Sequence, residues 1–415
     1  MPTAACFMRD SPLCELPVEL LQQIFSYCTA FEDPHFRHHA YPACIAITHV
    51  CSRWRAAALN YSSLWTLINT ETIGKRWIEA FIERSDPSFI DLTLEFSPET
   101  DRTKHFQSVD EVIALFTGCT RLRSLRLICK ISIVRRLLGE LHTATPIRSL
   151  SLSIIDPDIR PVVLPDNMLG GQVPVPTVRF FTIGSSIIAP RWFLRGITHF
   201  TSYQLISLRG LLDILRQMPA LYSFTLEGRV FSRAFNVEGP ATPRDVQIPM
   251  PNLMYFTVDV RKRSPTIFVQ LLRRLALPQG AKKSVRLHKS LSHSPKRWSP
   301  LVLGIPSYVR NVIEAANGLR HVQLSGGSTR GSFRLWTGDL GYEEAEFSFE
   351  FSWAAQGSGN GPLYPVIDLA ALCDLLGVER VCTLTLCTNS LDCIGSGEPF
   401  RGILLRKLPG AKVVE

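Results

Sequence analysis

Cysteine and histidine are the residues of this chain whose side chains could bind a metal ion or attack a substrate. The 415 residues include 11 cysteines and 10 histidines, with four of the cysteines near the C-terminal end and three of the histidines in the stretch HFRHH. These are Cys373, Cys382, Cys387 and Cys393, and His35, His38 and His39. The cysteine spacings fit no compact zinc site, and a solvated polar loop accounts for the histidines. We therefore predict no metal and no cofactor, with a metal at either group as the alternative.

The motifs of the common enzyme classes are also absent from the sequence. It contains no GxxxxGK[ST], no GxGxxG after a strand, no HExxH and no GxSxG. Serine, histidine and aspartate occur in any chain of this length, so their presence alone indicates no site. We predict that the protein is not an enzyme, and an enzyme with an unfamiliar site is the alternative.

Composition places the chain among ordinary folded proteins. Hydrophobic residues make up 46% and charged residues 20%, which excludes a mostly disordered, collagen-like or coiled-coil chain. No apolar run approaches the ~20 residues of a membrane helix, and the first residues lack a cationic stretch followed by an apolar core. We expect an intracellular protein, cytoplasmic or nuclear or both, that does not bind a membrane.

The positive charge of the chain, +9 overall, is most concentrated at residues 261–297. This segment holds eleven lysines and arginines and no aspartate or glutamate. A solvated loop flanked by a basic helix explains the segment, and a binding patch for an acidic partner is the alternative. Nucleic acid is the less favoured ligand, because only Phe268 and Trp298 could stack on bases.

The elements that would position a binding surface begin with apolar helices near the N-terminus. The stretch LPVELLQQIFSYC predicts a helix starting at Pro17, with Glu19 in the first turn where the helix dipole favours an anion. One broad apolar face is formed by Leu20, Leu21, Ile24, Phe25 and Cys28. A second helix is predicted over residues 43–60, with an apolar stripe of Ile47, Val50, Cys51, Trp54 and Ala58.

A third short helix is predicted in YSSLW, where Ser62 or Ser63 would cap the turn before Leu64 and Trp65. Three short helices of this length cannot bury so many large apolar groups by themselves. The surplus predicts a partner protein that covers them. The alternative is that these residues pack on the following domain.

These residues resemble an F-box, over positions 14–66. Leu16-Pro17 is followed by Glu19, Leu20, Ile24 and Phe25, then by Val50-Cys51-x-x-Trp54-Arg55, and then by Leu64-Trp65, in the order of that family. The resemblance implies that the helices bind the small Skp-type adaptor of a cullin–RING ubiquitin ligase. It assigns to the adaptor face Leu16, Pro17, Leu20, Ile24, Phe25, Val50, Cys51 and Trp54. Residues 30–43 depart from the family by forming a longer link between the first two helices.

The stretch that begins at Trp77 predicts a helix over 77–84, a proline-containing turn and a strand. It resembles the segment after the F-box in many fungal, especially mushroom, F-box proteins. After residue 88 a phrase recurs: an apolar residue, two variable ones, an apolar one, one variable and an apolar one. Its copies are Phe89-Leu92-Leu94, Leu122-Leu125-Leu127, Ile147-Leu150-Leu152, Val178-Phe181-Ile183, the partial Ile197-Phe200, Leu221-Phe224-Leu226, Leu253-Phe256-Val258, Leu319-Val322-Leu324 and Val381-Leu384-Leu386.

Several copies follow a helical pattern and a breaker, and strands that alternate with helices imply parallel strands. The phrase resembles leucine-rich repeats, although the spacing is irregular and the usual asparagine is absent. We therefore predict an α/β fold: an N-terminal three-helix F-box followed by an irregular leucine-rich-repeat-like α/β solenoid. Some intervals must hold unrecognised units or insertions. A two-layer α/β domain with one mixed sheet is the alternative.

Side chains alternate along a strand, so the residues between the apolar positions of each phrase point to the open face of the sheet. That face is suited to gripping a peptide or a protein. Its predicted target-binding residues are Arg126, Phe180, Thr182, Thr225, Tyr255, Thr257, His321, Gln323 and Thr385.

The sequence thus predicts four parts: a tail at 1–13, the F-box at 14–66, a helical brace or linker at 67–88 and a repeat domain for the target at 89–415. The expected function is that of a substrate-receptor subunit of an SCF-type cullin–RING ubiquitin ligase, in the ubiquitin conjugation pathway. Its partners would be the Skp-type adaptor, the ligase bound through that adaptor, and an unknown target protein. The alternative function is a protein- or nucleic-acid-binding module outside any ligase that uses the basic segment 261–297.

Overall fold

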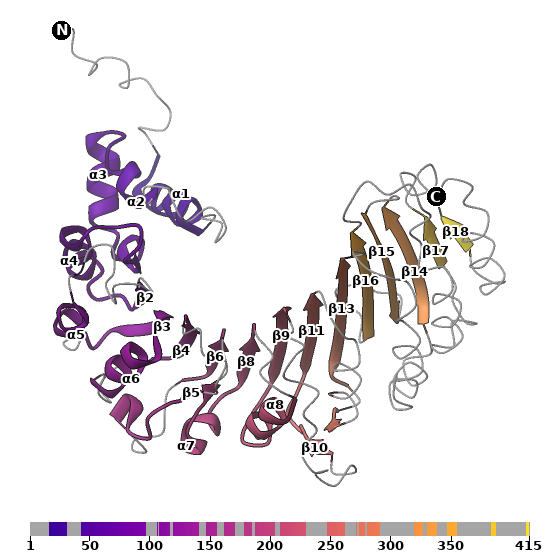
Figure 1. The fold of residues 1–415 in the computed structure, drawn as a ribbon. Coiled ribbons are helices and arrows are strands. Elements are labelled where there is room, and N and C mark those ends of the chain that lie inside the picture. The colour runs from indigo at the N-terminus through magenta and orange to yellow at the C-terminus, as the bar shows by residue number, and fades with distance from the viewer. Residues whose placement is uncertain are drawn as a thin grey trace. The chain divides into compact units, whose positions relative to one another are not determined.

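The computed structural model describes residues 16–30, 43–96, 106, 108–116, 119–140, 147–155, 162–170, 178–184, 187–203, 208–229, 247–261, 271, 274–278, 280–290, 319–326, 330–337, 347–354, 383–386 and 412–414. The chain divides into two compact units, Met1–Phe181 and Thr182–Glu415. Each unit is a combination of helices and mainly parallel strands (Figure 1). The predicted mixture of helix and strand is therefore confirmed.

The first unit begins with the predicted apolar helices, α1 (Val18–Ala30), α2 (Ala43–Ile47), α3 (Ser52–Leu59) and the 3-10 turn η3 (Ser62–Trp65). Glu19 lies in the first turn of α1, as expected. Pro17 precedes the helix, and its carbonyl accepts a hydrogen bond from the Leu21 amide at 3.2 Å. A proline at this position loses nothing, since its missing N–H has no partner within the helix.

The single helix expected over residues 43–60 is wrong, because the chain breaks it into α2 and α3. The Thr48 hydroxyl donates to the Ile45 carbonyl at 2.7 Å, where α2 ends. Cys51 is extended, with φ −156° and ψ 171°, and its Sγ accepts from the Trp54 amide as the N-cap of α3. The expected serine cap of the third turn is also wrong. Tyr61 is the N-cap of η3 without a side-chain bond, while the Ser62 and Ser88 hydroxyls pair at 2.8 Å.

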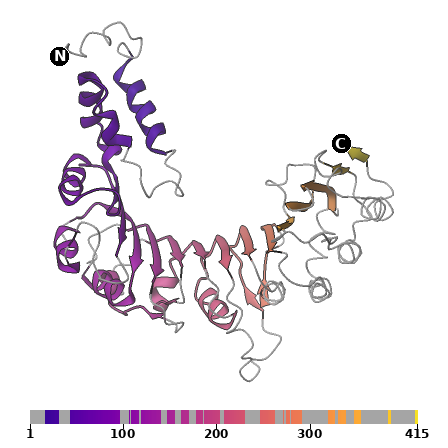
Figure 2. The ribbon, with the colours of Figure 1, turned by 45° about the horizontal axis from the view of Figure 1, so that its top comes forward.

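A parallel sheet follows directly in the same unit. Its strands are β1 (Leu67–Asn69), β2 (Ile90–Glu95), β3 (Leu122–Cys129) and β4 (Ser149–Ile154), paired in this order. Helices α4 (Lys75–Arg84), α5 (Val109–Phe116) and α6 (Ile131–Glu140) connect them. The three helices lie on one side of the strands (Figure 2). β5 (Val162–Val163) and the turn η4 (Met168–Gly170) complete the unit, and β6 (Phe180–Ile183) lies at its boundary.

The second unit continues with alternating short helices and strands. Its elements are β7 (Ile187–Ile188), α7 (Arg191–Leu194), β8 (His199–Ser202), α8 (Leu208–Leu215), β9 (Ser223–Arg229), β10 (Ile248–Pro249), β11 (Tyr255–Arg261), β12 (Leu275–Ala276), β13 (Lys282–Ser290), β14 (Leu319–Gly326), β15 (Arg330–Thr337), β16 (Phe347–Ala354), β17 (Thr383–Leu386) and β18 (Lys412–Val414). The sheet order in this unit is β8-β9-β11-β13-β16-β15-β14-β17-β18. β15 runs antiparallel to both β14 and β16, so the sheet of this unit is mixed, as the alternative fold required.

The recurring apolar phrase marks strands throughout both units. Its copies fall on β2, β3, β4, β6, β8, β9, β11, β14 and β17. The apolar positions with described side chains are buried, except for Phe89 at the start of the first copy, which is exposed. The irregular spacing has a physical cause, since the long interval between the copies at Leu253 and Leu319 contains the unrecognised strand β13. β1 was also missed, so the segment predicted as a helical brace opens with a strand.

The interpretation of residues 261–297 as a loop and a basic helix is wrong where β13 crosses them. β13 pairs in parallel with β11 and β16 over its length. Lys283 is 4% exposed, and its Nζ donates to the Ala281 carbonyl at 2.6 Å. Part of the basic segment is therefore sheet core, which removes support for its use as one continuous binding patch.

Two further sequence expectations concern metals and membranes. Within the described ranges, no group of three or more histidine, cysteine, aspartate or glutamate side chains could hold a metal ion. The HFRHH histidines and the four C-terminal cysteines lie outside those ranges. None of the described helices has the length and apolar character needed to cross a bilayer.

Candidate functional site

The N-terminal helices bury an apolar core, which Phe81 of α4 helps to enclose. Leu21 and Phe25 of α1, Ile45 of α2, Ala58 of α3 and Trp65 of η3 have no exposed surface. The buried indole N–H of Trp65 donates to the Ala58 carbonyl at 2.8 Å, so burial leaves no polar group unsatisfied there. The apolar side chains that remain outside this core are therefore not needed to fill it.

Helix α1 divides its broad apolar face between that core and solvent. Leu21 and Phe25 lie four residues apart and form the buried stripe, whereas Leu20 is 43% and Tyr27 66% exposed. Ile24, which lies between Leu20 and Tyr27 on the helix surface, is half-buried. Residues at i, i+4 and i+7 lie on one side of a helix, so Leu20, Ile24 and Tyr27 form a second, uncovered stripe.

The start of α3 adds a second part to this exposed surface. Val50 is 41% exposed, and Cys51 and Trp54 are half-buried. The guanidinium of Arg53 donates to the Leu16 carbonyl, which joins the beginning of α3 to the beginning of α1. We name this surface the adaptor face, after the partner that the sequence predicts for it, and it comprises Leu16, Pro17, Val18, Leu20, Ile24, Tyr27, Val50, Cys51 and Trp54.

Phe25 was expected on this face, but the structure places it behind the face. Its ring is fully buried and lies 5.2 Å from the ring of Trp54, tilted by 59°. Phe25 therefore supports Trp54 from within. Sequence reasoning missed Tyr27, although its position three residues after Ile24 and seven after Leu20 is the signal that would have found it.

The helices are coupled tightly to the sheet of the same unit. Trp65 packs edge-on against Phe81 of α4 at 5.0 Å, and the Arg84 guanidinium lies 4.7 Å from the Trp65 ring centre. β1 starts two residues after Trp65, and the Asp91 amide of β2 donates to the Thr66 carbonyl at 2.9 Å. Because the backbone passes from helix to paired strand so quickly, the helices cannot swing freely on the sheet.

Arg121 also contacts the C-terminal end of α4. Its guanidinium donates to the Ile82 carbonyl at 2.9 Å and to the Ser88 carbonyl at 2.6 Å, and it lies 3.4 Å from the Asp86 carboxylate. From its position just before β3, Arg121 thus satisfies the Ile82 carbonyl in the last turn of α4 and the Ser88 carbonyl in the turn that follows the helix. The helix expected as a brace is thus held at its C-terminal end, by Trp65 and by Arg121.

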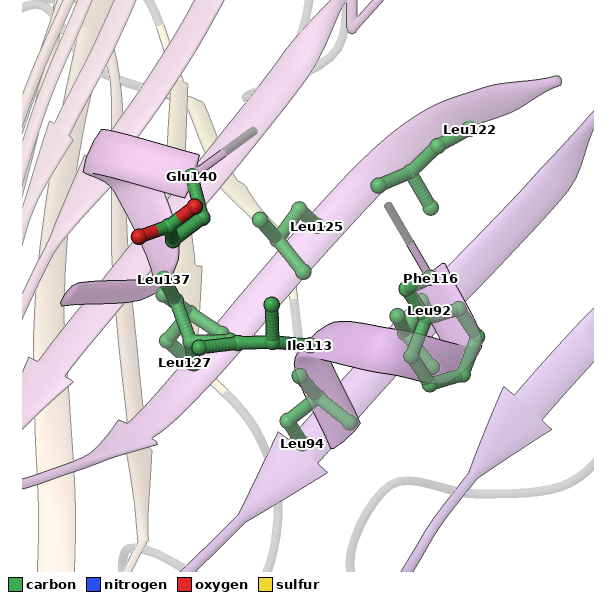
Figure 3. Close-up of a pocket in the computed structure, with 9 residues that line it drawn as sticks. All are labelled: Leu92, Leu94, Ile113, Phe116, Leu122, Leu125, Leu127, Leu137 and Glu140. Carbon is green, nitrogen blue, oxygen red and sulfur yellow. The ribbon is translucent and has the colours of Figure 1, made fainter. Parts of the chain in front are cut away.

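The described cavity in the first unit is a packing gap and offers no chemistry. It lies between α5, α6 and strands β2 and β3, and eight of its nine lining residues are apolar (Figure 3). Its volume of about 10 Å³ holds at most one water molecule. A substrate needs a far larger space, so this cavity does not favour an enzyme.

The predicted target-binding residues are spread over both units. Arg126 is exposed on β3, and Phe180 is 44% exposed on β6. Thr182, Thr225 and Thr257 are half-buried, and Tyr255 is 42% exposed at the start of β11. The remaining three, His321, Gln323 and Thr385, hold register positions on β14 and β17, and their side chains lie outside the described ones.

Residues 13–71 match the family described as F-box-like. This match supports an F-box protein. The matched range contains the whole adaptor face and extends through β1, beyond the predicted end of the F-box at residue 66. No curated protein matches the chain significantly. F-box domains bind Skp-type adaptors in SCF ubiquitin ligases, and F-box proteins are in general non-catalytic. The domain therefore indicates a role in such a ligase.

Proposed function

We propose that this chain is the substrate-receptor subunit of an SCF-type cullin–RING ubiquitin ligase. The adaptor face would bind the Skp-type adaptor, and the sheet region from residue 89 onward would bind a target protein. The proposal includes the predicted division into tail, F-box, brace and target domain, and the fungal type with a leucine-rich-repeat-like domain.

The observation that carries the proposal is the uncovered apolar stripe on helices whose core is already full. Leu20, Tyr27 and Val50 are exposed although Leu21, Phe25 and Trp65 satisfy the packing of the unit. A contiguous exposed apolar surface is typical of a protein–protein interface. The alternative is that these side chains pack on the domain that follows the helices. The described residues of the first unit, which include strands β1 to β4, leave Leu20, Tyr27 and Val50 exposed and so do not favour it.

A receptor of this kind performs no bond chemistry. It raises the local concentration of a target lysine near a conjugating enzyme held elsewhere in the ligase, and the gain depends on how rigidly the two are joined. The contacts of Trp65 and Arg121 with the brace helix α4 are consistent with this requirement, because they join the F-box helices to the sheet of the same unit.

Co-purification of the full chain with a Skp-type adaptor tests the proposal. Val50→Asp places a charge on the adaptor face, and Val163→Asp is the matched control, since Val163 is 51% exposed on β5 in the same unit. We expect the wild type and Val163→Asp to retain the adaptor and Val50→Asp to lose it. Circular dichroism must show that both variants are folded. A wild type that fails to bind the adaptor, or a folded Val50→Asp that binds it normally, refutes the proposal.

A further inference from the structure

The second unit carries exposed tyrosine side chains at the amino-terminal ends of two neighbouring strands, β9 and β11. Tyr222, just before β9, is 40% exposed, and Met254 and Tyr255 at the start of β11 are each 42% exposed. The Tyr222 ring lies 5.4 Å from Tyr255 and 5.7 Å from His199 of β8. We call His199, Tyr222, Met254, Tyr255 and Lys282 the tyrosine ledge.

The backbone fixes these residues side by side. The Met254 amide donates to the Tyr222 carbonyl at 2.8 Å, and the Lys282 amide donates to the Met254 carbonyl at 2.7 Å. The sheet register pairs Tyr255 with Lys282. Helices α7 and α8 lie on one side of this sheet (Figure 2), and the inward residues Phe224 and Phe256 are buried. The exposed ledge residues therefore lie on a rigid, preformed surface, which lowers the entropic cost of binding.

The charge at the ledge is positive. Lys282 is exposed and stands in register with Tyr255, and the next outward positions along the strands are the hydroxyl residues Thr225, Thr257 and Ser284. The outward carboxylates, Glu227 and Asp259, lie four residues along their strands from the ledge, or about 13 Å. This distance exceeds the screening length of about 8 Å at physiological ionic strength. An approaching ligand therefore meets the charge of Lys282.

The tyrosine hydroxyls add a polar but uncharged component. The hydrogen bond to Tyr255 raises the pKa of Tyr222, so the Tyr222 phenol stays neutral at physiological pH. Burial lowers the pKa of His199, which keeps that ring neutral as well. The ledge thus combines apolar rings, hydroxyl groups and one ammonium.

We infer that the tyrosine ledge binds an extended segment of the target protein that places an apolar side chain against Tyr222 and Tyr255 and an adjacent aspartate or glutamate against Lys282. This inference rests on the proposed function, because it names the class of target that the receptor takes. It also gives a role to Lys282, an exposed lysine within the basic segment 261–297 whose neighbour Lys283 is buried.

The test selects binding peptides from a displayed library of random 12-residue sequences on the immobilised full chain. We expect enrichment of peptides with an aromatic, aliphatic or proline residue next to aspartate or glutamate. For the best such peptide, Lys282→Gln weakens binding about threefold to fivefold and reduces its salt dependence. Tyr255→Ser weakens binding about tenfold at every salt concentration.

Two matched variants of the same unit serve as controls. Lys412→Gln removes another exposed lysine, on β18, and Tyr203→Ser removes another exposed tyrosine, just after β8. Both are expected to bind the peptide as the wild type does. Any one of three results overturns the inference: enrichment of cationic peptides, no enrichment of any peptide above a blank surface, or equal losses of peptide affinity in the control and ledge variants.

Adaptor binding of every variant, measured in parallel, separates this inference from the proposed function. A chain that binds the adaptor but selects no acidic–apolar peptide refutes the inference alone. A chain that selects such peptides through the ledge but binds no adaptor refutes the receptor role alone.

Discussion

The neighbouring leucines at the start of α1 are expected to respond in opposite ways to the same truncation. Leu20 is 43% exposed on the adaptor face, and Leu21 is fully buried in the core of the helices. Leu20→Ala should therefore weaken adaptor binding with little loss of fold stability. Leu21→Ala should destabilise the fold itself.

The magnitudes follow from burial. Complete burial of a leucine side chain contributes about 1.5–3 kcal/mol, so covering the exposed part of Leu20 contributes about 1 kcal/mol. With the space that truncation leaves in the interface, Leu20→Ala should cost about 1–2 kcal/mol, or about 5- to 30-fold in Kd. Leu20→Ala should lower the free energy of unfolding by about 1 kcal/mol or less, whereas Leu21→Ala should lower it by about 2–5 kcal/mol.

Two assays separate these effects. Isothermal titration with the purified adaptor gives the Kd of each variant, and urea unfolding followed by circular dichroism gives its free energy of unfolding. The reasoning fails if a folded Leu20→Ala binds the adaptor with wild-type affinity. It also fails if the two variants lose equal amounts of unfolding free energy, since the two leucines would then not differ in role.

The remaining predictions concern the brace and the second unit. Arg121→Met should lower the free energy of unfolding by about 1.5–3 kcal/mol, because it frees carbonyls at the end of α4. Arg123→Met, which removes a more exposed guanidinium that is paired with Asp91, should cost less than about 1 kcal/mol, and equal losses in urea unfolding would contradict the brace. Burial lowers the pKa of His199, so the unfolded state binds a proton at this ring more readily than the folded state does. The free energy of unfolding therefore falls as the pH drops below 6.5. His199→Gln should reduce the fall in urea midpoint between about pH 7 and about pH 5, and an unchanged fall would contradict this assignment.

Periodicity in the sequence predicted the elements that bury one regular apolar side. The α1 helix and the strands that carry the recurring phrase belong to this class, because their buried positions repeat at the period of a helix or a strand. The same reasoning found a surplus of large apolar groups in the N-terminal helices, and the F-box resemblance assigned Leu20 and Val50 to the adaptor face. Periodicity could not divide the face of α1 into Leu20 outside and Phe25 inside, because that division depends on where Trp54 and Trp65 pack.

Elements without such a pattern were missed for identifiable reasons. β13 has Lys283 in register with Phe256, the middle apolar position of the recurring phrase, so its sequence does not match that phrase. β1 is three residues long and is stabilised by pairing with β2. The break between α2 and α3 depends on a hydrogen bond to the Cys51 sulfur, which is an uncommon N-cap. For β1 and β13 strand pairing outweighs the local preference, whereas the break before α3 depends on a local hydrogen bond.

Hydroxyl-radical footprinting of the full chain, alone and with the Skp-type adaptor, tests most directly whether another protein covers the bare stripe. The account predicts that Leu20, Tyr27 and Val50 are oxidised in the free chain and protected in the complex. Leu21 should be unreactive in both, and Val163 should react equally in both. Equal oxidation of Leu20, Tyr27 and Val50 with and without the adaptor would contradict the central claim.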